Sequence, residues 1–182
     1  CYSIRKEYYT KVPKAFFMDD FFITMHALNK EGYAINELNA LCYEDVSNRI
    51  SEEFRRKVRI SIGNFQNLVR YRHLLWKWNG LAFCYWSHKV IRWIGPFLLL
   101  IMLFCSGILS LNYSYFNIIF IAQLILFLIP LLDELFKKNK LHITLLRFIS
   151  HFYLMNFALF VGFFKFIKGV ESNIWKPTER YQ

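Results

Sequence analysis

Apolar and polar positions divide the chain into a mixed first half and a mainly apolar second half. No charged side chain occurs from Trp93 to Leu132, and about 20 apolar residues suffice to cross a bilayer. A polar group at Asn112–Asn117 interrupts this run and contains two tyrosines, which is typical of a turn at the membrane surface. The run therefore predicts two membrane helices, at about 96–111 and about 115–132.

A third apolar block covers about 145–164 and is closed by Lys165 and Lys168. Its hydrophobic length favours a third crossing. Cytoplasmic loops carry an excess of Lys and Arg, so a third crossing would place these two lysines on the disfavoured side. The alternative is a re-entrant or interfacial element over 141–168. We expect about three membrane helices within 96–168.

Residues 1–50 show a mixed pattern of helical and extended segments. Residues 1–4 and Tyr33–Tyr43 predict short strands. Between them, Asp19 or Asp20 is a suitable N-cap for a helix, and Gly32 suits the C′ position that ends it. This pattern predicts an α/β unit.

Positive charge gathers in the middle of the chain. The sequence has 23 Lys and Arg against 13 Asp and Glu, a net charge of +10, and ten of the basic residues fall in 46–92 against two acidic ones. Ser51 can cap a helix there. Its apolar stripe has spacings of three and four and consists of Phe54, Val58, Ile62, Phe65 and Val69. Because its other faces are basic, we expect this helix to lie in the membrane interface, with a second interfacial element at 81–95.

The composition excludes several classes of protein. An aromatic content of 20% is too high for a disordered chain. The four cysteines are far apart and form no CxxC pair, which excludes a disulfide scaffold. No metal-ligand spacing occurs, so we expect no metal site within this chain. The basic stretch adjoins a membrane segment and contains no nucleic-acid-binding motif, so we expect no nucleic-acid partner.

Two acids are candidates for catalysis. Asp19 and Asp20 stand at the start of a predicted helix, where the helix dipole favours an ionised carboxylate. Such a carboxylate can take a proton from a hydroxyl group. The alternative is structural: one aspartate caps the helix and the other is solvated.

Two basic clusters are further candidates. Arg56 and Arg59 could bind a diphosphate through charge-assisted hydrogen bonds, or could attract anionic lipid. Ser87 and His88 are adjacent, but no acid or oxyanion element accompanies them in the sequence, so we do not expect a catalytic triad. His88 and Lys89 fit groups that pack or snorkel at the membrane surface.

Six segments in a fixed order carry a family resemblance: YSIRKEYY, DDFFITMHALNKEGY, ALCYEDVS, EEFRRKVRISIGNFQNL, FCYWSHKVIRWIGPFLLL and NIWKPTER. They resemble the C-terminal part of the membrane-integrated family 2 glycosyltransferases, which include bacterial synthases of cell-surface polysaccharides and cell-wall-biogenesis transferases. The resemblance implies that residues 1–50 are the acceptor-side end of an α/β GT-A (Rossmann-like) catalytic domain. It implies interfacial helices at 51–95, a membrane anchor at 96–168 and a tail at 169–182.

The resemblance also implies roles for single residues. Asp20 matches the family's general base, which deprotonates the acceptor hydroxyl, and Asp19 matches its neighbour at the acceptor site. Arg56 and Arg59 match the Gln and Arg of the family's Gln-x-x-Arg-Trp motif near the donor diphosphate, and Ile60 stands in place of the Trp. The implied reaction is inverting transfer from a nucleotide sugar, with a UDP-sugar expected, to a glycan or lipid-linked acceptor.

The family's donor-binding half would lie upstream of Cys1, with an Asp-x-Asp motif that holds Mg or Mn. We therefore expect the divalent metal to be bound there and this chain alone to be inactive. The resemblance implies a multi-pass protein of a bacterial-type inner or plasma membrane, in contact with membrane lipids. The basic stretch 46–92 before the first crossing predicts that the N-terminal, catalytic part lies in the cytoplasm.

Two other functions are compatible with the sequence. One is a non-catalytic membrane anchor or assembly protein whose basic collar binds anionic lipid or a partner. The other is a small transporter, which we rank last because Gln123 is the only amide deep in the first two predicted crossings.

Overall fold

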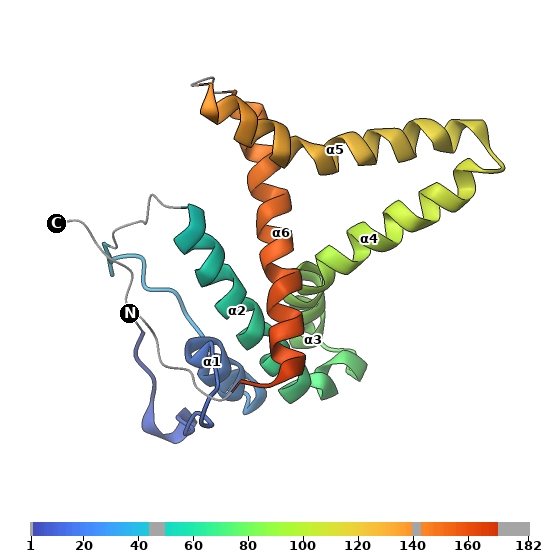
Figure 1. The fold of residues 1–182 in the computed structure, drawn as a ribbon. Coiled ribbons are helices and arrows are strands. Elements are labelled where there is room, and N and C mark those ends of the chain that lie inside the picture. Colours follow the sequence, from blue (N-terminus) through green and yellow to red (C-terminus); the bar gives the residue numbers. More distant parts are fainter. Residues whose placement is uncertain (1, 44–49, 140–142, 171–182) are drawn as a thin grey trace.

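The computed structural model describes residues 2–43, 50–139 and 143–170 (Figure 1). Every regular element in these ranges is helical. The longer helices are α1 (Asp19–Asn29), α2 (Ile50–Arg70), α3 (Gly80–Tyr85), α4 (Ile91–Ser110), α5 (Ser114–Lys138) and α6 (Thr144–Lys168). Short helical turns are η1 (Lys6–Tyr8), η2 (Arg72–Trp76) and η3 (Trp86–Val90), of which η3 is a π-helical turn that joins α3 to α4.

The prediction of an α/β unit is wrong for the described residues, which contain no strand. Residues 2–4 are irregular, and Cys1 lies outside the described ranges. The segment Tyr33–Tyr43 is irregular and contains a turn at Leu38 and Asn39, with Tyr33 94% and Ile35 92% exposed. A strand needs a neighbouring strand to receive its backbone hydrogen bonds. Because the described part of the chain supplies no such neighbour, the extended pattern produces no sheet.

If Asp19 were the N-cap, α1 would begin at Asp20, but the helix begins one residue earlier, at Asp19. Its N-cap is Met18, held in the left-handed region with φ 57°, and its first turn carries Asp19 and Asp20. The prediction that one of these acids caps the helix is therefore wrong. Both carboxylates instead lie in the first turn, where they still interact favourably with the helix dipole.

The end of α1 is a Schellman turn. Glu31 occupies the C′ position with φ 62°, and the Gly32 N–H donates to the Ala27 carbonyl over 2.9 Å. Gly32 is thus at C″, one residue beyond the predicted place. A Cβ atom there would lie 2.8 Å from the Ala27 oxygen and 3.1 Å from the Tyr8 ring. Close backbone approach therefore requires glycine at this position.

Helix α2 packs the centre of its predicted apolar stripe against α6, and the two share the largest helix–helix interface of the described chain. The Phe65 ring lies 4.9 Å from the Phe163 ring, centroid to centroid. The Ser61 hydroxyl donates to the Leu159 carbonyl over 2.7 Å, and Gly162 lies directly against Ser61. The stripe is confirmed at these central positions, but it is covered by protein where lipid was expected.

The opposite side of α2 holds the corner that leads into α1. Gly63 has no side chain, so the Phe17 and Met18 side chains can approach its backbone closely. The Gln66 side chain donates to the Ala15 carbonyl over 2.9 Å and accepts from the Phe17 N–H over 2.8 Å. A single glutamine therefore fixes the chain just before Asp19.

Replacing Gln66 by Ala is expected to loosen this corner. The change removes two hydrogen bonds and leaves two backbone groups without partners, at a cost of about 1–3 kcal/mol. The measurement is thermal unfolding of the detergent-solubilised protein together with limited proteolysis near residue 17. Gln66→Glu keeps the acceptor but not the donor, so an intermediate effect is expected. Unchanged melting in both variants would contradict this account.

A small core joins α1 to the segments that follow α2. Phe22 and Met25 of α1 pack with Tyr71, Leu74 and Trp93, all of them buried. The Tyr71 hydroxyl donates to the Phe22 carbonyl over 2.8 Å. Burial raises the pKa of Tyr71 to about 12. This core holds the first turn of α1 against α3 and η3.

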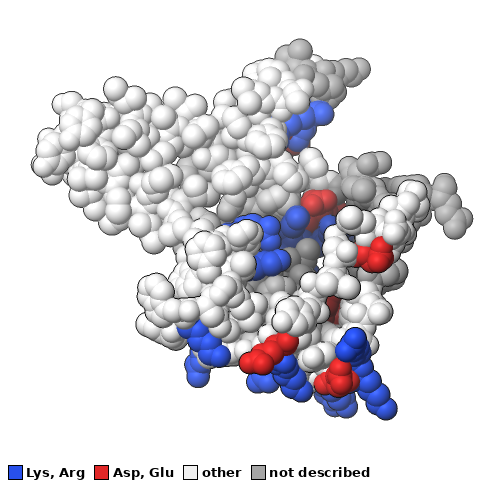
Figure 2. All heavy atoms as spheres, turned by 180° about the vertical axis from the view of Figure 1, so that it is seen from behind, with Lys and Arg blue, Asp and Glu red and all other residues white. Residues whose placement is uncertain are grey.

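Helices α4 and α5 form a hairpin that projects away from the rest of the molecule (Figure 1). Near its tip, Gly107 faces the Phe120 ring, and the Ser106 hydroxyl donates to the Gln123 side-chain oxygen over 3.2 Å. The lobe formed by the hairpin arms is uncharged on its surface in Figure 2. The helical structure predicted for these two segments is confirmed.

Three helical stretches are long and apolar enough to cross a membrane: Gly80–Ser110, Ser114–Lys137 and Thr144–Lys168. They match the three apolar blocks of the sequence, and we therefore describe the chain as a multi-pass membrane protein. The first stretch begins well before Pro96, because α3 and η3 continue directly into α4.

Helix α6 runs across the hairpin (Figure 1). Its Tyr153 ring lies 4.8 Å from the Phe127 ring of α5, and its Phe163 ring lies 4.8 Å from the Phe97 ring of α4. Along their helices, Phe97 and Phe127 are equally many residues away from the hairpin turn between α4 and α5. Both contacts are thus about 20 Å from the hairpin tip, given the helical rise of about 1.5 Å per residue. Helix α6 therefore meets both arms at one level.

Candidate functional site

Asp20 lies on the rim of a hollow of about 660 Å³ between α1 and the α3–η3 segment, which we call the Asp20 hollow. Its walls are mainly apolar. The polar groups of its lining include Asp20 and Thr24 from α1 and His88 and Lys89 from η3. Asp20 is exposed, so its carboxylate is open to a ligand that enters from solvent.

The first turn of α1 concentrates negative charge beside the Asp20 hollow. Asp19 adjoins Asp20 but does not belong to the lining of the hollow. Burial, followed by the negative charges of Asp19 and Asp20, raises the pKa of Tyr2, which also lines the hollow. The Thr24 hydroxyl donates to the Asp20 backbone carbonyl over 2.9 Å, which leaves the Asp20 carboxylate outside this bond. An exposed carboxylate in this setting can accept the proton of a hydroxyl group.

His88 and Lys89 are the two residues that sequence reasoning did not connect with Asp20. The Lys89 ammonium lies 5.1 Å from the centre of the Phe21 ring, next to Asp20 in the chain. No sequence pattern marked this connection, because the π-helical turn η3, a feature frequent at functional sites, is visible only in the structure. The packing of η3 against α1, which the sequence did not show, places both side chains in the lining of the same hollow as Asp20.

The Ser87–His88 pair does not form an activated nucleophile. The Ser87 oxygen lies 2.7 Å from His88 Nδ1, and the Ser87 hydroxyl donates its proton to the Phe83 carbonyl over 2.8 Å. A hydroxyl has one proton, and the Phe83 carbonyl competes with His88 for the proton of Ser87. This competition disfavours the histidine as a base toward Ser87.

Arg56 and Arg59 lie on α2 and do not line the Asp20 hollow. They share one helix face with Gly63, at spacings of three and four residues. Gly63 contacts Met18, the residue before Asp19, so this face leads from the arginines to the start of α1. The structure thus places the arginines on the face of α2 that leads to the corner and Lys89 in the lining of the Asp20 hollow.

The described residues contain no group of three or more His, Cys, Asp or Glu side chains that could hold a metal ion. Asp19 and Asp20 supply only two carboxylates, and a divalent cation requires more protein or substrate oxygens than these. The described part of the chain therefore does not fit a divalent-metal site by itself.

Comparison with known proteins leaves the chain without an assigned relative: no protein-family model, no curated protein and no solved structure matches it.

Proposed function

We propose that the chain is the C-terminal part of a membrane glycosyltransferase. It would transfer a sugar, with inversion, from a nucleotide sugar to a glycan or lipid-linked acceptor in cell-surface polysaccharide synthesis, with a UDP-sugar as the expected donor. The observation that supports this most is the position of Asp20 at the Asp20 hollow, with Lys89 in the same lining. Inverting sugar transfer needs a base for the acceptor hydroxyl and cations for the leaving diphosphate.

Each candidate residue has a distinct role in this proposal. Asp20 takes the proton of the acceptor hydroxyl, and Asp19 helps to orient the acceptor. Arg56 and Arg59 lie on the face of α2 that leads to these acids and stabilise the diphosphate. His88 and Lys89, from the far side of the hollow, contact polar groups of the acceptor. The donor nucleoside and a Mg or Mn ion would be bound by residues upstream of this chain.

The direct test is a transfer assay with the chain in its natural sequence context. Membranes that contain the protein, with any sequence encoded upstream, are supplied with a panel of radiolabelled nucleotide sugars. Incorporation into glycan or lipid extracts is then measured. Transfer from at least one donor is the expected result, and the absence of transfer from every donor in the panel would contradict the proposal.

A second candidate function is a non-catalytic membrane anchor or assembly protein with a lipid-binding basic collar. The all-helical character of the described residues favours it, because a catalytic GT-A domain would have left part of a sheet within 1–50. The coding sequence upstream of Cys1 separates the two functions. An open reading frame with a strand–helix pattern and an Asp-x-Asp motif supports the enzyme, and a start codon adjacent to Cys1 supports the anchor.

We further propose that the α4–α5 hairpin crosses the membrane twice and that α6 lies along the cytoplasmic surface. Helix α6 meets both arms of the hairpin at one level, so it runs across them. It also packs along α2, which carries seven Lys, Arg, Asp and Glu side chains. A charged side chain in the centre of a bilayer costs about 2.5–3.5 kcal/mol or more. If α6 crossed the membrane, α2 would enter the bilayer with it, because the two helices pack together, and several of these charged side chains would lie in the apolar region.

Labelling of single cysteines is expected to place both ends of α6 on one side of the membrane. Leu145→Cys and Ile167→Cys, exposed near its two ends, should react with an impermeant maleimide only from the cytoplasmic side, in inverted vesicles. Tyr113→Cys at the hairpin tip should react only in intact cells. The background protein has its four cysteines replaced by Ser. Reaction of positions 145 and 167 from opposite sides would establish a third crossing instead.

A further inference from the structure

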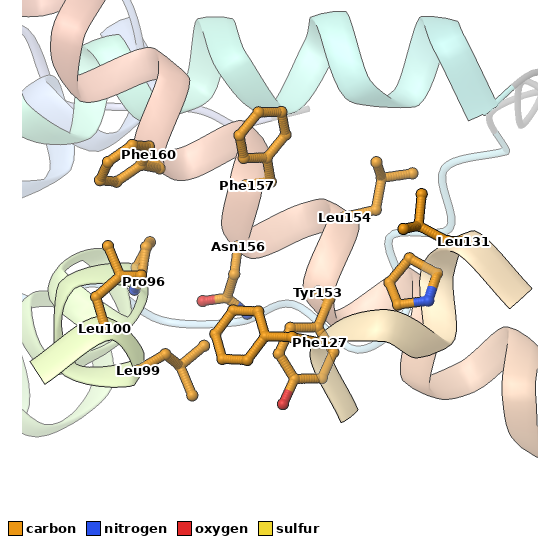
Figure 3. A pocket seen from close by; sticks show the side chains of 11 residues that line it. Pro96, Leu99, Leu100, Phe127, Leu131, Tyr153, Leu154, Asn156, Phe157 and Phe160 are labelled. Atoms are coloured by element: carbon orange, nitrogen blue, oxygen red, sulfur yellow. The ribbon is translucent and has the colours of Figure 1, made fainter. Parts of the chain in front are cut away.

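An apolar groove of about 530 Å³ opens where α6 crosses the base of the hairpin, and we call it the hairpin groove (Figure 3). All three long apolar helices line it. Its walls include Pro96 and Leu99 of α4, Phe127 and Leu131 of α5, and Asn156 and Phe157 of α6. In Figure 3 the Asn156 side chain projects among these apolar groups.

The hairpin groove exists because the two arms are in contact near the tip and separate toward the base. Gly107 allows α4 to approach Phe120 of α5 closely. Farther from the tip, α6 contacts α5 through Tyr153 and α4 through Phe160, whose ring lies 5.4 Å from that of Phe97. Tyr153 and Phe160 are two helical turns apart, which is about 10 Å of α6. This length of α6 therefore bridges the gap between the arms.

Water is a poor occupant of this groove. A stable enclosed water needs two to four polar partners. The side chains of the lining offer only the Tyr153 hydroxyl and the Asn156 amide, and the amide already donates to the Phe152 carbonyl over 2.9 Å. The groove is continuous with the exposed apolar surface of the hairpin, where Leu98 and Ile101 face outward. In a bilayer this surface is covered by lipid chains, so the groove is filled from the same source.

One turn before the groove, α4 carries a cation, Arg92, which does not itself belong to the lining. Arg92 precedes Pro96 by four residues and Leu99 by seven, so the three lie on one face of α4. Arg92 is exposed, and it makes no ion pair with a described carboxylate. The guanidinium can therefore bind a phosphate oxygen at headgroup depth. Apolar walls with an arginine at one end match an amphipathic anion.

We propose that the hairpin groove binds one acyl chain of an anionic phospholipid, whose phosphate contacts Arg92. The bound chain fills the space between the arms and holds α6 across them. This inference does not depend on glycosyl transfer, and its test contains no activity measurement.

The test is native mass spectrometry of the whole protein released from nanodiscs of mixed phosphatidylglycerol and phosphatidylcholine. The wild type is expected to retain one phosphatidylglycerol. Leu99→Trp fills the groove and should lower this occupancy at least tenfold. The matched control Leu98→Trp adds the same ring on the outward face and should retain the lipid. Arg92→Gln should retain a lipid but lose the preference for phosphatidylglycerol, whereas Arg72→Gln, an exposed position away from the groove, should keep the preference.

Three results would overturn the proposal. The first is equal lipid retention by Leu99→Trp and Leu98→Trp, with both proteins melting as the wild type does. The second is an unchanged preference for phosphatidylglycerol in Arg92→Gln. The third comes from the same mass measurement on protein isolated directly from cell membranes. It is retention of a polyprenyl diphosphate in place of a phospholipid. The first result rejects the groove as the site, and the other two reject the anionic phospholipid as its occupant.

Discussion

Under the proposed function, replacing Asp20 by Asn is expected to lower the rate of sugar transfer by about 10²–10⁴-fold while folding and membrane insertion remain intact. The amide cannot take the proton of the acceptor hydroxyl. The structural cost should be small, because the Asp20 side chain is exposed and only its backbone carbonyl accepts the bond from Thr24. The measurement is initial rate at saturating donor in membranes with equal amounts of protein. Near-normal turnover would reject Asp20 as the base.

Two variants separate a catalytic effect from a general loss of negative charge. Glu37→Gln removes a distant exposed charge and keeps the oxygen that accepts from the Asn39 N–H, so its rate should be normal. Asp19→Asn changes the neighbouring acid, which does not line the Asp20 hollow. We expect it to raise the KM for acceptor more than it lowers kcat. If Asp19→Asn lowered the transfer rate as much as Asp20→Asn does, the two carboxylates together would act as the base.

Replacing Gly162 by Ala is expected to destabilise the protein by about 1–3 kcal/mol, because it overpacks the contact between α2 and α6. The new methyl group would collide with the Ser61 side chain and lie 2.8 Å from the Val58 carbonyl oxygen. Separation of the helices would also strain the bond from Ser61 to the Leu159 carbonyl. At about 2–4 °C per kcal/mol, the melting temperature should fall by about 2–12 °C. Thermal unfolding in detergent micelles measures this change.

Gly80→Ala is the matched control for this substitution. Gly80 is the first residue of α3, and no atom beyond its chain neighbours and the backbone of its own helix lies within 4 Å of the position that its Cβ would occupy. Alanine loses less conformational entropy in a helix than glycine, so this variant should melt at the same temperature as the wild type or slightly above it. Similar decreases in Gly162→Ala and Gly80→Ala would show that the α2–α6 contact is not the cause.

The long apolar helices could be predicted closely from the sequence. The predicted segments 96–111, 115–132 and 145–164 lie almost entirely within α4, α5 and α6. A helix satisfies its own backbone hydrogen bonds, and the absence of charge from Trp93 to Leu132 is a local property. Such features need no knowledge of distant residues.

The strands and the caps of α1 could not be predicted in the same way. A strand is stabilised by partners elsewhere in the chain, and Tyr33–Tyr43 has none among the described residues. At the start of α1, Met18 takes the N-cap position although aspartate is the better capping residue. The corner before α1 is held by Gln66 and by close contact with Gly63, both on α2. These tertiary contacts override the local preference.

The candidate site shows the same division. Its acids and its basic clusters are visible as residue types in the sequence, and the roles of Asp19, Asp20, Arg56 and Arg59 remain predictions. The meeting of Lys89 with Asp20 in one hollow depends on packing between α1 and η3, which lie far apart in the sequence. No local spacing encodes such a contact.

The sequence by itself determined that this chain has a charge-free hairpin long enough to cross a membrane and a basic amphipathic helix before it. Only the tertiary structure decided what covers the apolar stripe of α2 and how α6 lies against the hairpin. The physical reason is that apolar burial has no direction. Lipid and a neighbouring helix satisfy an apolar stripe equally well, and the choice depends on shape, here on Gly162 against Ser61 and on Phe65 against Phe163.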